Sequence, residues 1–532
     1  MPRYKLLNKN VLKKHGMVEI TPYPQTNKTI LEGVIESYTP YLGGDFDSQT
    51  NKEAITIDEK QKLIYATGYP KPKSIIANMR WITRIAVATV KGLNSYKEAE
   101  MEPLPIDILK NDYKNISLTT LLFGATSSQK GLPKKFTAFK GLVSIRLTPV
   151  SELYSQKENF ILEKDIESSP FNKYNRYSAL LRRGKDGKES KIPIKKGFLK
   201  FEIALSIDEN RLRNIMHLST PLMKDITDLV KDSFIATVLI FGIGSGVNRG
   251  FGRFTFTLTQ EDQAKILSYV SDPILFITTL TKNLVNAVAS LYKIEFDSQV
   301  ISSLKNIPLF NRYSMQISAI NYHTNVSNNN IYLAAIEKIS KYMTKSVLKR
   351  DTQQDSLNIH TWILGLPRYV RYTGYLPLRR KEDLLIVIGE NCRNLKSKIQ
   401  CPPNYDPLIY DKEVEKYSSK ISRRQSMIIG FPWFSGNQGN VKLILMSMFA
   451  NDLHQLVFCD KNDCLYHFSQ SPRKLNCIYT GVNLRRVLTT DRIEVDCKLF
   501  KVKRRVSRSM TYEKLLRRMF NLVQKELREK QF

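Results

Sequence analysis

A stretch rich in glycine and arginine is the part of this 532-residue chain whose residue types most clearly suit ligand binding. The segment FGIGSGVNRGFGRF, residues 241–254, places five glycines within eleven positions, with Arg249 among them and Arg253 directly after them. Glycine permits positive φ angles and close approach of a bulky ligand to the backbone. Exposed amides in such a turn form concavities for phosphate oxygens, and guanidinium groups match phosphate geometry. The segment therefore predicts a phosphate-binding loop.

Two common phosphate-binding motifs do not fit this segment. A P-loop needs a second glycine five positions after the first, followed by lysine and then serine or threonine. A dinucleotide fingerprint needs Gly-x-Gly-x-x-Gly between a strand and a following helix, whereas the expected order here is helix, loop, strand. The plainer alternative is a tight connection between a helix and a strand, for which one or two glycines would suffice.

The charge of the whole chain favours a polyanionic partner. Lysine and arginine number 82 against 50 aspartates and glutamates, which gives a net charge of +32. Such an excess strains a compact fold unless a partner neutralises it, although a lysine-rich proteome would give the same balance. The apolar runs are shorter than the ~20 residues that cross a bilayer, and the first residues lack a signal-peptide pattern. We expect a cytoplasmic protein.

The cysteines and histidines give no clear catalytic or metal-binding pattern. All six cysteines lie in the last third of a long chain, so we expect reduced thiols rather than a disulfide framework. His454, Cys459, Cys464 and His467 could supply four ligands to zinc, but their spacings do not match the usual paired motifs. The six histidines form no obvious catalytic pair. We therefore predict no cofactor and no catalytic residue.

The first half has a readable order of secondary structure. Alternating apolar residues predict strands, and apolar residues at helical spacing predict helices. In the first predicted helix, Arg80, Arg84 and Lys91 form a basic side opposite the apolar one. The resulting order β-α-β-β-α-β is the ferredoxin-like pattern, in which two helices cover one face of an antiparallel sheet. The predicted strands are 29–38, 141–148, 198–207 and 254–259, and the predicted helices are 74–91 and 225–240.

The second half divides into two further regions. Residues 261–350 have helical character, and residues 351–532 regain strand-like segments punctuated by glycine and proline. The last helix, 511–529, has an apolar stripe and a basic flank. We therefore predict an α+β chain with an N-terminal domain over 1–260, a helical region over 261–350 and a C-terminal domain over 351–532.

Several motifs resemble those of one protein family. A ferredoxin-like domain whose second helix leads into GIGSGVNRGFGRF resembles the RAMP (repeat-associated mysterious protein) superfamily of CRISPR systems. The segments YTPYLGG (38–44), SIIANMRWITRIAVA (74–88), LLFGATSSQKG (121–131), WILGLPR (362–368) and SRRQSMIIGFP (422–432) resemble the first-numbered RAMP subunit family of the type III-B (Cmr) effector complex. In that family the first helix often carries consecutive tryptophans, whereas Ile82 and Thr83 follow Trp81 here.

The resemblance implies two tandem ferredoxin-like (RRM-like) domains and a non-catalytic, RNA-binding role at the end of the Cmr complex. Such a subunit would contact the 3′ part of the guide RNA (crRNA), the 5′ portion of the target RNA and other Cmr subunits. It would read backbone and shape, because base pairing reads the sequence. The implied RNA-binding residues are Arg80, Trp81, Arg84, Gly244, Ser245, Gly246, Asn248, Arg249, Gly250 and Arg253.

Two other functions stay open at the level of sequence. Some RAMP relatives cut CRISPR repeat RNA without a metal, and His15 is the one histidine placed in the N-terminal region where a base would sit. A mainly structural scaffold, whose basic faces dock acidic proteins, would also account for the charge.

Overall fold

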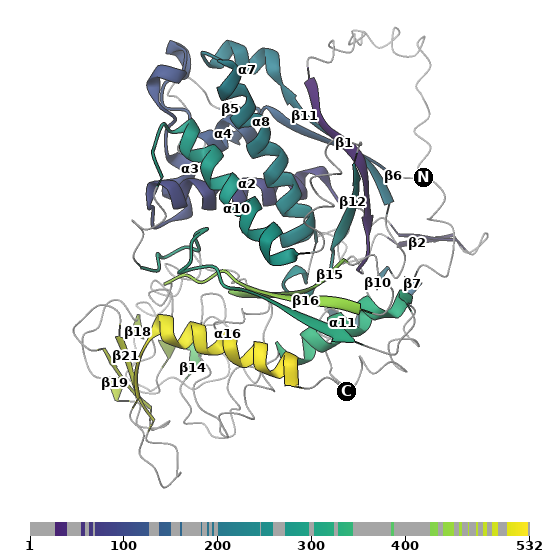
Figure 1. Ribbon diagram of the computed structural model, residues 1–532, viewed down its shortest axis with the longest axis vertical. Helices are drawn as coiled ribbons and strands as arrows, with labels where there is room; N and C mark the ends of the chain where they lie inside the picture. The colour runs from purple at the N-terminus through teal and green to yellow at the C-terminus, as the bar shows by residue number, and fades with distance from the viewer. Residues whose placement is uncertain are drawn as a thin grey trace, which may run out of the picture.

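Two units built of sheet and helices, one from each half of the chain, pack against each other in the computed structural model (Figure 1). The structure describes residues 27–39, 70–126, 138–149, 200–244, 246–258, 272–296, 303–323, 328–343, 426–434, 440–451 and 508–529, together with several short strands between these ranges.

The first unit has the predicted order of elements. Its four strands form one antiparallel sheet in the order β12-β1-β11-β6, so that the fourth and third strands flank the first. The mixture of helices with an antiparallel sheet agrees with the predicted α+β class, and the order of the elements is the one expected from the sequence. The elements are β1 (Asn27–Ser37), α2 (Pro72–Lys91), β6 (Val143–Pro149), β11 (Lys200–Asp208), α8 (Thr220–Ile235) and β12 (Phe254–Leu258).

Local sequence explains where the helices begin and which side they bury. Pro72 opens α2, where its fixed φ suits the first turn, and Gly92 ends the helix with a φ of 64°. The Ser219 hydroxyl accepts a hydrogen bond from the Leu222 amide at the start of α8. The apolar side of α2 faces the sheet and includes the fully buried Ile75 and Met79.

Shorter elements and one long helix complete the first half. The helix α10 (Pro273–Leu291) packs on α8 and α2. Among the described helices, α10 is the one long and apolar enough to cross a membrane by length and composition, and most of its apolar residues are buried within the protein. The other helical segments are α3 (Tyr96–Met101), η1 (Ile106–Ile108), η2 (Asn111–Tyr113), α4 (Leu118–Phe123), α7 (Glu209–Ile215), η4 (Ala236–Phe241) and η5 (Val247–Arg249).

Five of the described elements in the second unit follow one another in the same order as five elements of the first. Its described strands form an antiparallel sheet in the order β13-β16-β15, which corresponds to β1-β11-β6. The strand β13 lies inside the region predicted to be helical, so this unit begins before residue 351. The elements are β13 (Ile317–His323), α11 (Asn328–Tyr342), β15 (Ile428–Trp433), β16 (Asn440–Ser447) and α16 (Tyr512–Glu529).

The remaining described strands form small antiparallel sheets. The one with the most strands has the order β19-β20-β21-β22, and its last strand leads directly into α16. The bounds are β2 (Ile55–Asp58) with β3 (Leu63–Ala66), β4 (Ala125–Thr126) with β5 (Ala138–Phe139), β7 (Phe160–Ile161) with β10 (Ile194–Lys195), β8 (Arg182–Arg183) with β9 (Glu189–Ser190), β14 (Leu385–Val387) with β17 (Val457–Cys459) and β18 (Tyr466–His467), and β19 (Leu475–Asn476) with β20 (Val482–Arg486), β21 (Arg492–Cys497) and β22 (Arg508–Thr511).

One continuous apolar core joins the two units. Phe431 and Trp433 of β15 and Met446 of β16 belong to the same buried cluster as the helices of the first unit. The Trp433 ring lies 5.6 Å from the ring of Phe276 on α10. On the other side of the second sheet, α11 approaches so closely that a Cβ on Gly430 would lie 2.7 Å from Ile339. The second sheet is therefore covered on both faces.

Candidate functional site

The glycine-rich loop has a buried base and an exposed tip, and Arg253 organises the base. Its side chain is fully buried, and its guanidinium donates hydrogen bonds to the carbonyl oxygens of Ile240 and Val247. The same group lies 4.0 Å from the ring centroid of Phe431 in the second unit. Burial lowers the pKa of Arg253 to about 9, which leaves the side chain protonated at neutral pH. The Arg253 side chain is therefore not accessible to RNA in this structure, contrary to the prediction from sequence.

The glycines of the base are required by close packing within the protein. A Cβ on Gly252 would lie 1.9 Å from the Ile243 carbonyl oxygen, and one on Gly250 would lie 2.8 Å from Pro432 Cδ. Both residues also have positive φ angles, 62° and 90°. Gly250 was predicted to contact RNA, but it is buried where η5 meets β15 and α11.

A π-helical turn, which the sequence analysis did not predict, prepares the Arg253 site. The helix α8 continues into η4 with π geometry and ends at Gly242, whose φ is 77°. Carbonyl groups at the end of a helix lack partners within the helix. Arg253 supplies a donor to one of them, at Ile240, and so closes the end of this helix.

The tip of the loop faces solvent. Gly244 is exposed, and Gly246, Asn248 and Arg249 are half-buried, while Ser245 lies outside the described residues. Gly244 and Gly246 have φ angles of 101° and 73°. The backbone N–H groups of Gly244, Gly246, Val247 and Asn248 donate no hydrogen bond to any described residue. The tip therefore presents a short run of available amides beside Arg249, the arrangement that suits an anionic oxygen.

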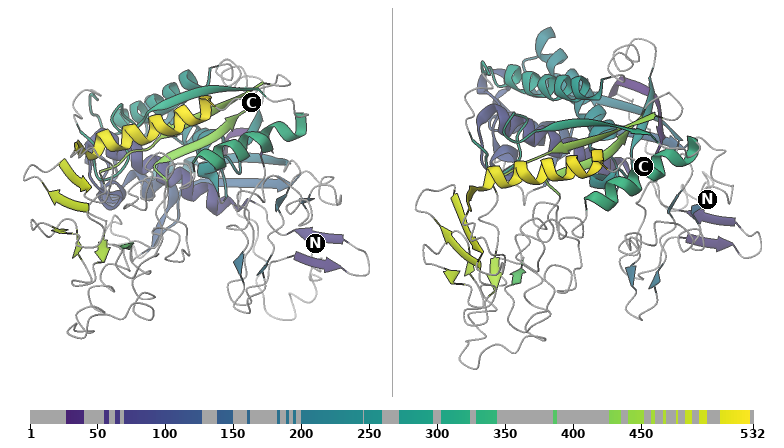
Figure 2. Two further views of the ribbon diagram at one scale, coloured as in Figure 1. Left: turned by 90° about the horizontal axis from the view of Figure 1, so that it is seen from below. Right: turned by 60° about the horizontal axis from the view of Figure 1, so that its bottom comes forward.

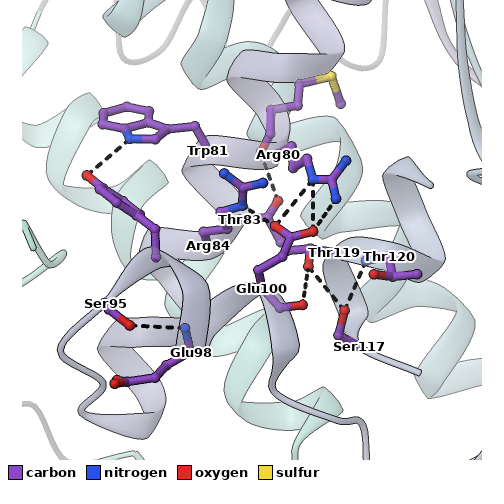
Figure 3. A network of polar contacts seen from close by, with 12 residues as sticks. Arg80, Trp81, Thr83, Arg84, Ser95, Glu98, Glu100, Ser117, Thr119 and Thr120 are labelled. Carbon is purple, nitrogen blue, oxygen red and sulfur yellow. Dashed lines mark hydrogen bonds and ion pairs between the residues drawn. The ribbon is translucent and has the colours of Figure 1, made fainter. Parts of the chain in front are cut away.

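The predicted basic side of α2 is held by carboxylates of the protein itself (Figure 3). Arg80 and Arg84 both donate to the Glu100 carboxylate on α3, and their side chains are 16% and 24% exposed. The Thr119 hydroxyl donates to the Glu100 backbone carbonyl at 3.2 Å and so fixes this part of α3. The two arginines thus have a structural partner that the sequence analysis did not identify.

Two other residues on α2, Lys91 and Trp81, also have partners within the protein. Lys91 pairs with Glu102 at 2.9 Å. The Trp81 indole donates to the Tyr96 hydroxyl at 3.2 Å, and its ring meets Phe241 edge-on at 5.1 Å. The signal for these contacts was the acidic run KEAEME, residues 97–102, shortly after the helix. Trp81, predicted to contact RNA, instead packs between α2, α3 and η4.

The first turns of α2 lie beside the loop. The Asn78 side chain donates to the Gly242 carbonyl oxygen at 3.2 Å. Lys73 and Lys71, five and seven residues before Asn78, are exposed, and the first turn of α2 contains no acidic residue. The unpaired amides at a helix N-terminus carry partial positive charge, so this end of α2 adds to the positive potential near the loop. The sequence analysis missed these two lysines, although they immediately precede the predicted helix.

The open face of the first sheet does not resemble a base-stacking surface. Cross-strand register places Glu32, Glu36 and Glu202 on the face away from the helices, with Thr255 and Thr257 beside them. RRM domains bind RNA by stacking bases on aromatic residues of their sheet. This face carries glutamates and threonines at the corresponding central positions, so the RRM-like expectation does not extend to its binding mode.

No metal-binding cluster occurs within the described residues. No group of three histidine, cysteine or acidic residues there could hold a metal ion. His217 and His323 are described, and both are exposed. His15 lies outside the described part of the chain, and so do the side chains of the four possible zinc ligands, His454, Cys459, Cys464 and His467.

The structure describes only parts of the motifs that suggested the family. Residues 40–44, 127–131, 362–368 and 422–425 lie outside the described ranges. In the described parts, the motif glycines allow close packing: a Cβ on Gly124 would lie 2.7 Å from the Gly141 amide nitrogen. Gly430 of the motif at 422–432 likewise allows close packing, in this case against α11.

Comparison with known proteins gives low-level structural likenesses. No family model and no curated protein matches the chain. The structure is similar to Cmr1 from Pyrococcus furiosus, with a TM-score of 0.40 and 13% identity over 79% of this chain and 88% of that one. It is also similar to a chain of the type III-B Cmr-beta complex bound to cognate target RNA, with a TM-score of 0.40 and 13% identity over 83% and 96% of the two chains. A third likeness is to a chain of Cmr-beta bound to target RNA and AMPPnP in the presence of ssDNA, with a TM-score of 0.39 and 11% identity over 85% and 97%. These TM-scores are too low to establish a shared fold.

Proposed function

We propose that this chain is a non-catalytic RNA-binding subunit of a type III-B CRISPR (Cmr) ribonucleoprotein and that the tip of the glycine-rich loop contacts the RNA backbone. The observation that carries the proposal is the run of available amides at the exposed Gly244 and the half-buried Gly246–Asn248, next to Arg249. In the complex, the RNA would be the 3′ part of the guide and the 5′ portion of the target.

Physical arguments favour phosphate as the group bound at the tip. Backbone amides in a turn with positive φ angles converge on an anionic oxygen, and they do so without reading a base. Lys71 and Lys73 add positive potential at the N-terminal end of α2. A chain with a net charge of +32 attracts RNA over a distance as well. Arg80 and Arg84 belong to the fold in this account, because Glu100 already binds both.

The test is RNA affinity measured for variants of the tip. We expect the double variant Asn248→Asp, Arg249→Gln to weaken binding of single-stranded RNA about ten-fold at 0.1 M salt, because it removes a cation and adds a charge that repels phosphate. The double variant Lys224→Gln, Lys282→Gln removes the same two units of charge from exposed lysines on α8 and α10; it is the matched control and should leave the affinity unchanged. An affinity of the tip variant within about two-fold of wild type would remove the tip from the site.

The non-catalytic part of the proposal has its own test. Purified chain incubated with CRISPR repeat RNA in EDTA should leave the RNA intact. A discrete cut that disappears in His15→Ala would instead identify a metal-independent ribonuclease.

A further inference from the structure

The exposed side of α16 carries a row of cations that the proposed site does not use. Arg518, Lys525 and Arg528 are exposed, and Asn521 lies between them on the same side. Their spacing of three, seven and ten residues from Arg518 keeps all four side chains along one face of the helix, over about 15 Å. In the right-hand view of Figure 2, α16 lies across the second sheet on the side away from the first unit.

The fold leaves this row accessible. The opposite side of α16 is buried against the second unit through Leu516, Met519, Phe520 and Val523. Within the described residues, Arg518 and Arg528 form no ion pair or hydrogen bond. Lys525 pairs with Glu529 at 3.6 Å, but both side chains are more than half exposed, so this contact competes weakly with a ligand.

We propose that this row is a second RNA-binding surface, which contacts the phosphate backbone of single-stranded RNA. The proposal rests on RNA being the ligand of the chain, as inferred above, but it uses a different element in the other unit. Phosphate contacts need cations and amide side chains, which this face supplies, and they need no apolar centre.

The absence of apolar side chains argues against other occupants. A protein interface is built around a desolvated core rich in aromatic and apolar residues. The large hydrophobic residues that are strongly exposed in the described part of the chain are Ile106, Ile274 and Leu275, and none of them is on α16. A helix lying in a membrane surface would likewise need an exposed apolar face, whereas that of α16 is buried in the protein.

The experiment compares two triple variants of the full-length chain. Arg518→Gln, Lys525→Gln, Arg528→Gln removes the row, and glutamine preserves helix propensity. Lys114→Gln, Lys224→Gln, Lys282→Gln is the control, because it removes the same charge from exposed lysines outside the second unit. Circular dichroism verifies that both variants fold. Binding is measured by fluorescence polarisation with a single-stranded RNA of about 40 nucleotides, long enough to span more than one surface, at several salt concentrations.

We expect the α16 variant to bind RNA about ten-fold more weakly than the control, with a log–log salt slope about 2 units shallower, as the loss of three phosphate contacts requires. Equal affinities and equal slopes for the two triple variants would overturn the α16 proposal while leaving the proposed function intact. A poly-glutamate peptide that binds wild type but not the α16 variant, while the two triple variants bind RNA equally, would identify the row as a surface for acidic proteins and would also overturn the proposal. If the wild-type chain binds no RNA, both proposals fail.

Discussion

The first and second units share an order of elements but use their sheets differently. The strands β13, β16 and β15 repeat the arrangement of β1, β11 and β6, yet the first sheet gains a fourth strand, β12, after the glycine-rich loop. The face of the first sheet away from its helices is polar, with Glu32 and Glu202. The corresponding face of the second sheet is apolar and packs on α10 and the loop.

The difference indicates what the glycine-rich loop does for the fold. Because the second sheet rests on the base of the loop, the loop joins the two units as well as the elements α8 and β12. The Tyr38 hydroxyl donates to the Pro432 carbonyl at 3.0 Å beside this contact, and burial raises the pKa of Tyr38 so that it stays neutral. Only the tip of the loop remains for a ligand.

The largest effect is expected at Gly252. Alanine there would bring a Cβ to 1.9 Å from a backbone oxygen, at a φ of 62°, so we expect Gly252→Ala to lower the free energy of unfolding by about 3 kcal/mol or more. Gly92 has a similar φ, 64°, but open space around it, and Gly92→Ala should cost only about 1 kcal/mol. Urea unfolding of both variants measures the two values. Equal losses would mean that close packing at the base contributes little.

A smaller loss is expected from Arg253→Gln. This change removes two hydrogen bonds to carbonyl groups and the contact with Phe431, and we expect unfolding to become easier by about 2 kcal/mol. Arg249→Gln, four residues away, should lower stability less than Arg253→Gln does and should weaken RNA binding. Thermal unfolding and RNA titration of the two variants separate the base of the loop from its tip. The reverse result, in which Arg253→Gln is stable and binds RNA poorly, would refute this division.

Replacement of Glu100 should have a moderate effect on stability alone. Glu100→Gln leaves Arg80 and Arg84 side by side with no carboxylate between them, and because both are partly exposed we expect a loss of about 1–2 kcal/mol. RNA affinity should change by less than about two-fold, since these arginines belong to the fold in our account. A clear gain in affinity would show instead that Glu100 holds the arginines away from RNA.

The smallest effect is expected on the open face of the first sheet. Glu202 is exposed, and Glu202→Gln should change the free energy of unfolding by less than about 0.5 kcal/mol. RNA affinity should also stay within about two-fold of wild type. A larger gain in affinity, measured by the same titration, would place RNA on this face and restore the RRM-like mode of binding.

The order of the elements could be predicted from local patterns, because burial of one face imposes them. Phe254 and Phe256 alternate with threonines in β12, and Ile75, Met79 and Ile82 follow helical spacing in α2. The start of the second unit at β13 was missed, because one short strand between helices gives a weak periodic signal.

The roles of individual arginines could not be predicted in the same way. Arg249 and Arg253 look equivalent in sequence, and only the approach of Phe431, far along the chain, buries one of them. Arg80 and Arg84 form a basic side in a helical projection, but the fold of α3 brings Glu100 to them. Whether an arginine is buried or exposed depends here on packing between distant parts of the chain, and helical spacing carries no information about that packing.

Hydrogen exchange across residues 242–254, measured with and without RNA, tests the central claim most directly. The Ile243 and Arg253 amides already donate to Gly252 and Thr39, so they should be protected in both states. The amides of Gly246, Val247 and Asn248 should exchange rapidly in the free protein and become protected when RNA binds. Rapid exchange at the tip in both states, with RNA demonstrably bound, would contradict the account.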